Sequence, residues 1–156
     1  MQTEKVKEAP NIGVKKIEVL VVKPGKTPET VMIDQTLEAM QEVVDGLIES
    51  IMPFDDDATI ICNEEGKLLG MPLNRGLYDS DGNLQDIIAG TFFVALAPDD
   101  SEFFESLPPE KIKKYYELFR LPEMFMMFGG KIKGIKYEPE GEDYDEDELE
   151  ESVYYG

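Results

Sequence analysis

The chain has 156 residues, of which 42% are apolar, and its 34 acidic side chains against 15 basic ones give a net charge of −19. This length and apolar content suit one domain with one core rather than two. The single cysteine excludes an internal disulfide, and the lack of histidine excludes catalysis by a serine–histidine or cysteine–histidine pair.

The sequence predicts a cytoplasmic protein with no membrane anchor. No apolar run approaches the ~20 residues that cross a bilayer. Residues 1–10 carry both Lys and Glu and lack the apolar core of a signal peptide. Export and membrane insertion are therefore not expected.

The acidic side chains are concentrated in the middle of the chain and at its end. Residues 27–110 hold nineteen carboxylates against two bases, Lys67 and Arg75, whereas residues 138–151 hold ten acids and no base. A run of like charge with few apolar side chains predicts disorder. We therefore expect a flexible arm, a single domain and a disordered acidic tail, at residues 1–14, 15–137 and 138–156.

The first half of the domain predicts strands around one helix. Leu37, Met40, Val43 and Val44 have helical spacing, with Asp34 or Thr36 as the cap. Short β-branched runs flank this helix, and the first two of them are joined by a Pro-Gly turn typical of a hairpin. The expected elements are strands at 15–23 and 29–33, a helix at 36–45, strands at 47–52 and 58–63, and a turn at 64–67 that leads into 68–70 as a second hairpin.

The second half predicts a buried central strand, a helix and a final edge strand. Residues 90–97 are continuously apolar, which is typical of a strand covered on both faces. Pro109 is suited to the first turn of an amphipathic helix that Pro122 would end or kink. Lysines alternate along 131–137, as on many edge strands. Together these elements predict an α+β fold, with a mainly antiparallel mixed sheet and two helices.

Two acidic stretches resemble metal sites, but neither fits one well. Asp79, Asp81 and Asn83 match the first ligand positions of a calcium loop, but Leu84 and Gly90 stand where that loop needs Gly and Glu. This stretch predicts a hairpin turn instead. The consecutive acids at 55–57 point to alternate sides of an extended chain, which favours a charged loop. No metal and no cofactor are predicted.

The pair Asn74 and Arg75 and the apolar stretch 123–128 each allow two interpretations. A guanidinium among carboxylates is typically bound to one of them structurally, although Asn74 and Arg75 are also the best candidates for a ligand pocket. The Met- and Phe-rich stretch favours packing in the core or in a dimer over an exposed docking surface. Cys62 lies in an apolar run, which favours a buried structural thiol.

Three groups of acids in predicted turns form a candidate binding surface. If they meet at one end of the sheet, they would present clustered negative charge to a protein with a basic surface, as a DNA mimic does. A generally soluble acidic protein is an equally good interpretation. The candidate residues are Asp55, Asp56 and Asp57, then Asp79, Asp81 and Asp86, then Asp99 and Asp100.

Several short motifs resemble an uncharacterised domain family common in phages, plasmids and conjugative elements of Firmicutes. The resemblance covers residues 17–120 and assigns no catalytic residue. It implies a setting near antirestriction and other accessory genes. The motifs are Pro24-Gly25, Ile33-Asp34, Thr36-Leu37-Glu38-Ala39, Cys62-Asn63-Glu64-Glu65-Gly66-Lys67, Leu73-Asn74-Arg75 and Gly90-Thr91-Phe92.

Together these observations favour a non-enzymatic acidic binding protein of a mobile element. Its expected target is a host nucleic-acid-binding or defence protein, and direct nucleic-acid binding is not expected. Acid–base catalysis by two carboxylates is formally open but unspecific in so acidic a chain. The alternatives are a small-molecule or nucleotide-binding module at Asn74 and Arg75, and a regulatory or structural interaction domain.

Overall fold

A computed structural model describes residues 14–139 of the chain. Almost all of the expected N-terminal arm and of the expected acidic tail lie outside these residues. The described part contains nine strands and two helices. In chain order they are β1 (Lys16–Val22), β2 (Glu29–Asp34), α1 (Leu37–Val44), β3 (Ile48–Ile51), β4 (Ala58–Asn63), β5 (Leu73–Tyr78), β6 (Leu84–Ala89), β7 (Phe92–Leu96), α2 (Pro109–Phe119), β8 (Glu123–Phe128) and β9 (Lys131–Lys136).

The largest sheet has five strands in the order β2-β1-β7-β4-β3. Each neighbouring pair is antiparallel, including β7 between β1 and β4. The expected α+β class and the mainly antiparallel pairing are therefore confirmed, as is the central position of the apolar strand near residues 90–97. The first hairpin is confirmed as well, with Ile17 opposite Ile33.

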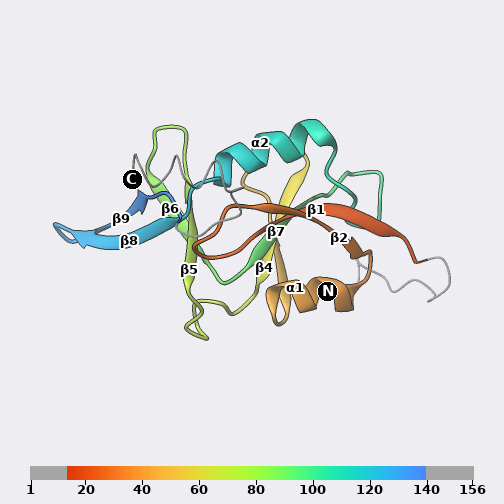
Figure 1. Cartoon of the computed structure of the whole chain (residues 1–156), viewed down its shortest axis with the longest axis horizontal. Coiled ribbons are helices and arrows are strands. Elements are labelled where there is room, and N and C mark those ends of the chain that lie inside the picture. Colours follow the sequence, from red (N-terminus) through yellow and green to blue (C-terminus); the bar gives the residue numbers. More distant parts are fainter. Residues whose placement is uncertain (1–13, 140–156) are drawn as a thin grey trace, which may run out of the picture.

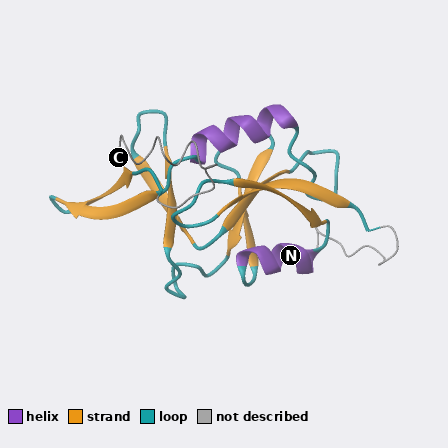
Figure 2. Cartoon of the chain, in the orientation of Figure 1, coloured by secondary structure: helices purple, strands orange, loops and turns teal. Residues whose placement is uncertain are grey.

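The two helices lie on opposite faces of this sheet (Figure 2). Alternate side chains of a strand point to opposite faces, so Phe93 on β7 packs toward Met40 of α1, whereas Phe92 packs toward Phe119 of α2. Burial on both faces explains the continuous apolar run of β7.

Local signals set the ends of both helices. The Thr36 hydroxyl accepts a hydrogen bond from the Ala39 amide at the start of α1, and Asp45 ends that helix in the left-handed conformation. Pro109 opens α2, where a missing amide hydrogen costs nothing. No helix within residues 14–139 is long and apolar enough to cross a bilayer.

Two hairpins lie beside the main sheet and form sheets of their own, β5–β6 and β8–β9 (Figure 1). The turn expected at 79–83 is confirmed as the turn of the β5–β6 hairpin. The final strand was expected at a sheet edge, and β9 is one of the two strands of the separate β8–β9 sheet. The second hairpin was placed wrongly, because residues 68–70 form turns and β4 pairs with β3 on one side and β7 on the other.

The stretch 123–128 was expected in the core or in a dimer interface. Within this chain the core assignment is wrong, since Met124, Met126, Met127 and Phe128 are exposed. The strand lies in a hairpin that extends away from the main sheet (Figure 1). Only its first residue, Glu123, is buried among the neighbouring side chains.

Candidate functional site

A half-open cavity of about 320 Å³ lies between the β3 edge of the main sheet and β6. Its walls come from β3, β4, the turn that follows β4, and β6. The side chains that line it are Glu49, Ile51, Cys62, Asn63, Glu64, Glu65, Gly66, Lys67, Leu68, Asp86, Ile87, Ile88 and Ala89.

Asn63 fixes the turn that forms one wall of the cavity. Its Nδ2 donates to the carbonyl oxygens of Val44 and Asp45, each at 3.1 Å, which joins the turn to the end of α1. Its Oδ1 accepts from the Glu65 amide at 2.7 Å. The turn is therefore held to the helix before it and shaped by the same side chain.

Gly66 brings this turn against β6. A Cβ atom at Gly66 would lie 2.6 Å from the carbonyl oxygen of Ala89, closer than real Cβ atoms approach backbone oxygen. The Gly66 carbonyl accepts from the Met71 amide at 2.9 Å and closes the loop. Glycine is required here by space, because the close contact with β6 leaves no room for a side chain.

The cavity is acidic. Four carboxylates against the single ammonium group of Lys67 leave a net charge of −3 among its lining residues. Lys67 Nζ lies 2.5 Å from Asp86 Oδ1, but both side chains are more than half exposed, so this pair is screened by water. Within residues 14–139, the other three carboxylates, Glu49, Glu64 and Glu65, are exposed and have no ion-pair partner.

Cys62 lies opposite Glu49 in the β3–β4 ladder and is buried, as the sequence predicts for this thiol. Burial raises the pKa of the Cys62 thiol to about 12, helped by the charges of Glu49 and Asp86 and opposed by Lys67. The thiolate is the reactive form of cysteine. Cys62 is therefore suited to lining the cavity with a neutral thiol rather than to nucleophilic attack.

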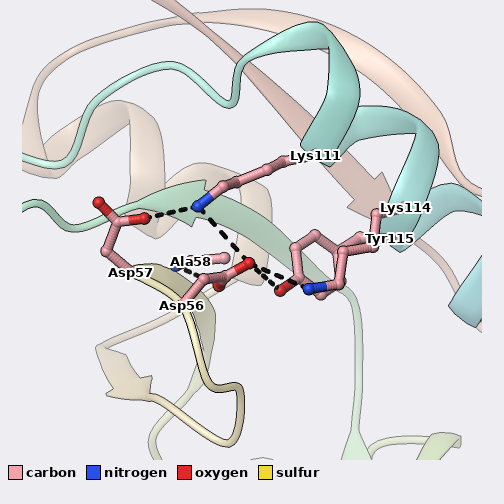
Figure 3. Close-up of polar contacts among 6 residues, drawn as sticks. All are labelled: Asp56, Asp57, Ala58, Lys111, Lys114 and Tyr115. Carbon is pink, nitrogen blue, oxygen red and sulfur yellow. Dashed lines mark hydrogen bonds and ion pairs between the residues drawn. The ribbon is translucent and has the colours of Figure 1, made fainter.

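In a second acidic group, at residues 55–57, Asp56 and Asp57 pair with lysines of α2 (Figure 3). Lys111 Nζ lies 2.8 Å from Asp57 Oδ1 and 3.5 Å from Asp56 Oδ2. Asp56 Oδ2 also accepts from the Tyr115 hydroxyl at 2.7 Å and lies 3.2 Å from Lys114 Nζ. Two of the three expected surface acids therefore connect the start of β4 to α2, while Asp55 is exposed.

Hydrogen bonding sets the ionisation of Asp56. Partial burial opposes its charged form, but donors from Ala58, Tyr115 and Lys114 and the charge of Lys111 lower the pKa of Asp56 to about 2. Burial and the bond to Asp56 raise the pKa of the Tyr115 hydroxyl. The carboxylate is therefore ionised and the phenol protonated throughout the neutral range.

The three expected acidic groups do not share one end of the sheet. Asp99 and Asp100 are exposed just after β7, near the first group, because the Ala97 amide donates to the Asp57 carbonyl at 2.7 Å. The group of Asp79, Asp81 and Asp86 belongs to the β5–β6 hairpin, on the other side of the molecule from the loop that follows β7 (Figure 1). An extended face formed by all three groups is thus absent from the described residues.

Asp79 is bound within its own turn. Its Oδ1 accepts from the Asp81 and Asn83 amides, each at 2.9 Å, and its Oδ2 accepts from the Gln85 amide group. The hydrogen bond from the Asn83 amide contributes most to lowering the pKa of Asp79. No group of three or more metal-ligating side chains converges anywhere in residues 14–139.

The side chains of Asn74 and Arg75 are buried and form hydrogen bonds to backbone carbonyl oxygens of the fold. Arg75 Nε and Nη2 donate to the Phe119 carbonyl at 3.0 and 2.8 Å, and Nη1 donates to Asn74 Oδ1 at 2.9 Å. Asn74 Nδ2 donates to the carbonyl oxygens of Val22 and Gly90. Neither side chain lines the cavity, so the geometry gives no support to a ligand pocket formed by this pair.

The fold and the cavity define an α+β domain with an acidic pocket at the edge of an antiparallel sheet. The chain belongs to the family described as a domain of unknown function, DUF3846, whose model matches residues 17–120. Neither a curated protein nor a solved structure shows significant similarity to the chain. The family match runs from β1 to the end of α2 and leaves out the β8–β9 hairpin.

Sequence reasoning found the motif around the cavity but not the cavity itself. Of the motif residues, Asn63, Gly66, Asn74 and Arg75 hold the fold through contacts that only the tertiary structure reveals. The segment 64–67 was interpreted as an ordinary hairpin turn, and Glu49 was not singled out. The sequence feature that could have indicated the cavity is the pair of acids Glu64-Glu65, which directly follows a buried strand.

Proposed function

We propose that this protein is a non-enzymatic acidic binding protein whose cavity accepts a basic side chain from a partner protein. The observation that carries the proposal is the set of four carboxylates, Glu49, Glu64, Glu65 and Asp86, that line the cavity together with a single lysine. Carboxylates without counter-ions at an opening attract cationic groups and speed their encounter with the surface.

The apolar part of the cavity wall suits the stem of a long basic side chain. Ile51, Ile88 and the neutral thiol of Cys62 line the cavity together with the carboxylates. Lysine and arginine bury their methylene chains against such surfaces and keep their charge at a polar rim. Leu68, which lines the cavity and has 82% of its surface exposed, adds an apolar contact for the partner.

Some other acids of the central window are less suited to this role. Asp56 and Asp57 are already paired with lysines of α2, and the partly buried Glu105 is paired with Lys15. A partner would have to displace these intramolecular ion pairs. The cavity therefore supports recognition of a basic segment better than mimicry of DNA along one long face.

We further propose a host nucleic-acid-binding or defence protein as the partner to test first. Proteins of that class carry basic surfaces for the phosphate backbone, which are complementary to an acidic cavity. The resemblance to domains of phages, plasmids and conjugative elements favours the same class by association. An inhibitor would act here by occupying basic side chains that otherwise contact nucleic acid.

The proposal is tested by removing the charge of the cavity without changing its shape. The cavity variant combines Glu49→Gln, Glu64→Gln and Glu65→Gln. The control variant, which has the same net charge, combines Asp81→Asn, Asp99→Asn and Asp100→Asn. Calorimetric titration, at low and at moderate salt, measures the affinity of each variant for octa-arginine. We expect the cavity variant to bind about tenfold more weakly than the control, which corresponds to ~1.4 kcal/mol.

Equal weakening in the two variants would contradict the proposal. It would mean that the peptide senses the overall negative charge of the protein rather than the cavity.

A further inference from the structure

The β8–β9 hairpin is an arm attached to the domain mainly at its base. Glu123 Oε1 accepts from the Tyr78 hydroxyl at 2.5 Å, and its Oε2 accepts from the Gly76 amide at 3.2 Å. Lys136 Nζ lies 5.9 Å from the centre of the Tyr78 ring. The Tyr137 amide donates to the Pro122 carbonyl at 3.1 Å and closes the base.

One face of this arm is apolar, basic and exposed. Cross-strand partners point to the same face of a hairpin, and the face opposite Glu123 contains Met124, Met126, Phe128, Lys131, Lys133 and Ile135. We call these six residues the outer face. Met124 is 53% exposed and Phe128 46%, so large apolar side chains stand in water beside two lysines.

Such a surface needs an acidic and partly apolar occupant. Contiguous exposed apolar side chains usually mark a contact surface, and the lysines select against a basic partner. Residues 140–156 of the same chain have this composition. They hold nine acids and no base, together with Tyr144, Leu149, Val153, Tyr154 and Tyr155.

The position and length of this segment allow it to reach the outer face. The last described residue, Pro139, follows Glu138, whose carboxylate lies 3.5 Å from Arg120 Nη1 next to the base of the arm. A six-residue strand is about 20 Å long. Seventeen residues can span ~56 Å, so the segment reaches the tip of the arm with length to spare.

We infer that the acidic C-terminal segment, residues 140–156, binds the outer face of the β8–β9 arm in the same chain. Its carboxylates pair with Lys131 and Lys133, and its tyrosine and leucine side chains cover Met126 and Phe128. Attachment at Pro139 keeps the segment at a high effective concentration near the arm, which compensates for weak individual contacts. Both partners lie outside the family match at residues 17–120, which is consistent with an addition that works as a unit.

This contact would give the arm an intramolecular competitor. Any acidic, apolar segment of another protein that binds the outer face would first have to displace residues 140–156. The arm and the acidic cavity have opposite charge preferences, so this inference is independent of the proposed function.

Zero-length coupling of lysine to carboxylate in the full-length chain tests the inference. Isotope-labelled and unlabelled chains are mixed, coupled with a carbodiimide and mapped by mass spectrometry. We expect Lys131 and Lys133 to couple to residues 140–151 of their own chain about tenfold more than the exposed Lys113 of α2 does, from the higher effective concentration. Met126→Ser with Phe128→Ser should remove this preference, whereas Leu118→Ser, an exposed apolar change on α2, should leave it.

Two results would overturn the inference. Coupled peptides that combine labelled and unlabelled chains in statistical proportion would place a second copy on the arm. Equal coupling of Lys113, Lys131 and Lys133 would show no preferred contact.

Proteolysis gives a second measurement that does not depend on the coupling chemistry. Chymotrypsin cleavage after Tyr144 should be several-fold faster in Lys133→Glu than in the native chain, and unchanged in Lys113→Glu. The same cleavage rate in both variants and the native chain would also overturn the inference.

Discussion

Arg75 of β5 donates two hydrogen bonds to the carbonyl oxygen of Phe119, the last residue of α2, 44 positions further along the chain. Nη2 of the same guanidinium donates at 2.5 Å to the carbonyl oxygen of Lys26, in the turn of the first hairpin. One fully buried side chain therefore joins three parts of the fold that have no strand pairing in common.

Replacing Arg75 with lysine should destabilise the fold strongly. An ammonium group cannot reproduce the planar arrangement of donors, and it would leave buried carbonyl oxygens unsatisfied. We expect a loss of about 3 kcal/mol in the free energy of unfolding, measured by urea denaturation. Lys67→Gln removes the other base of the acidic window but is exposed, so its cost should stay below ~0.5 kcal/mol. A similar small cost for both changes would show that Arg75 is not a structural link.

The contact between Asp56 and α2 should contribute measurable stability. Asp56→Ala removes the acceptor of the Tyr115 hydroxyl and of the Ala58 amide. We expect a loss of about 1–2 kcal/mol in the free energy of unfolding. Asp55→Ala, at the exposed neighbouring position, is the matched control and should change stability little. Equal effects at both positions would assign the stability to loop charge instead.

The same carboxylate predicts how stability depends on pH. Its pKa is lowered in the folded chain to about 2, so the unfolded state binds its proton at higher pH than the native state. The stabilisation is complete above the ordinary aspartate pKa near ~4 and is lost as pH falls through the folded value. The difference in unfolding free energy between the native chain and Asp56→Ala should therefore shrink between about pH 4 and 2, by roughly 1 kcal/mol after solvent screening. A difference that stays constant over this interval would contradict the assignment.

Gly66 should tolerate no side chain. In Gly66→Ala the new Cβ atom would meet the Ala89 carbonyl oxygen at 2.6 Å, so the turn must move away from β6. We expect a loss of about 2 kcal/mol in unfolding free energy. Gly70→Ala is the comparison, because it meets no atom and strains only a left-handed backbone, for ~1 kcal/mol. A smaller cost at Gly66 than at Gly70 would mean that the turn can move freely.

Cys62 should be inert toward thiol reagents in the folded protein. With its pKa raised to about 12, roughly one thiol in 10⁵ is ionised at pH 7. Labelling by iodoacetamide should be slow in the native chain and become fast in denaturant. Rapid labelling of the native chain would show that the cavity opens to expose its inner wall.

The sequence predicted the local elements better than their partners. Helical spacing and capping located α1 and α2, and the apolar run at 90–97 located β7, because these signals act within a few residues. The partner of a strand is set by contacts between distant segments, and local pattern does not encode it. For this reason the neighbour of β4 was wrongly assigned, and β5–β6 and β8–β9 were not recognised as separate sheets.

The candidate site shows the same limit. Asp55, Asp56 and Asp57 were identified as a charged loop, but the lysines that neutralise two of them lie more than fifty positions away, on α2. Glu49 enters the cavity only because β3 pairs with β4, which places it opposite Cys62. Charge counts along the chain could not distinguish carboxylates with internal partners from those without.

The most direct test of the acidic cavity is a titration followed by nuclear magnetic resonance. Backbone amide shifts of the labelled full-length chain are recorded while an arginine-containing peptide is added at moderate salt. We expect the largest shifts at Glu49, at Glu64 to Lys67 and at Asp86, with saturation at a single site. Shifts distributed over Asp99, Asp100 and the other exposed acids, without saturation, would contradict a binding function for the cavity.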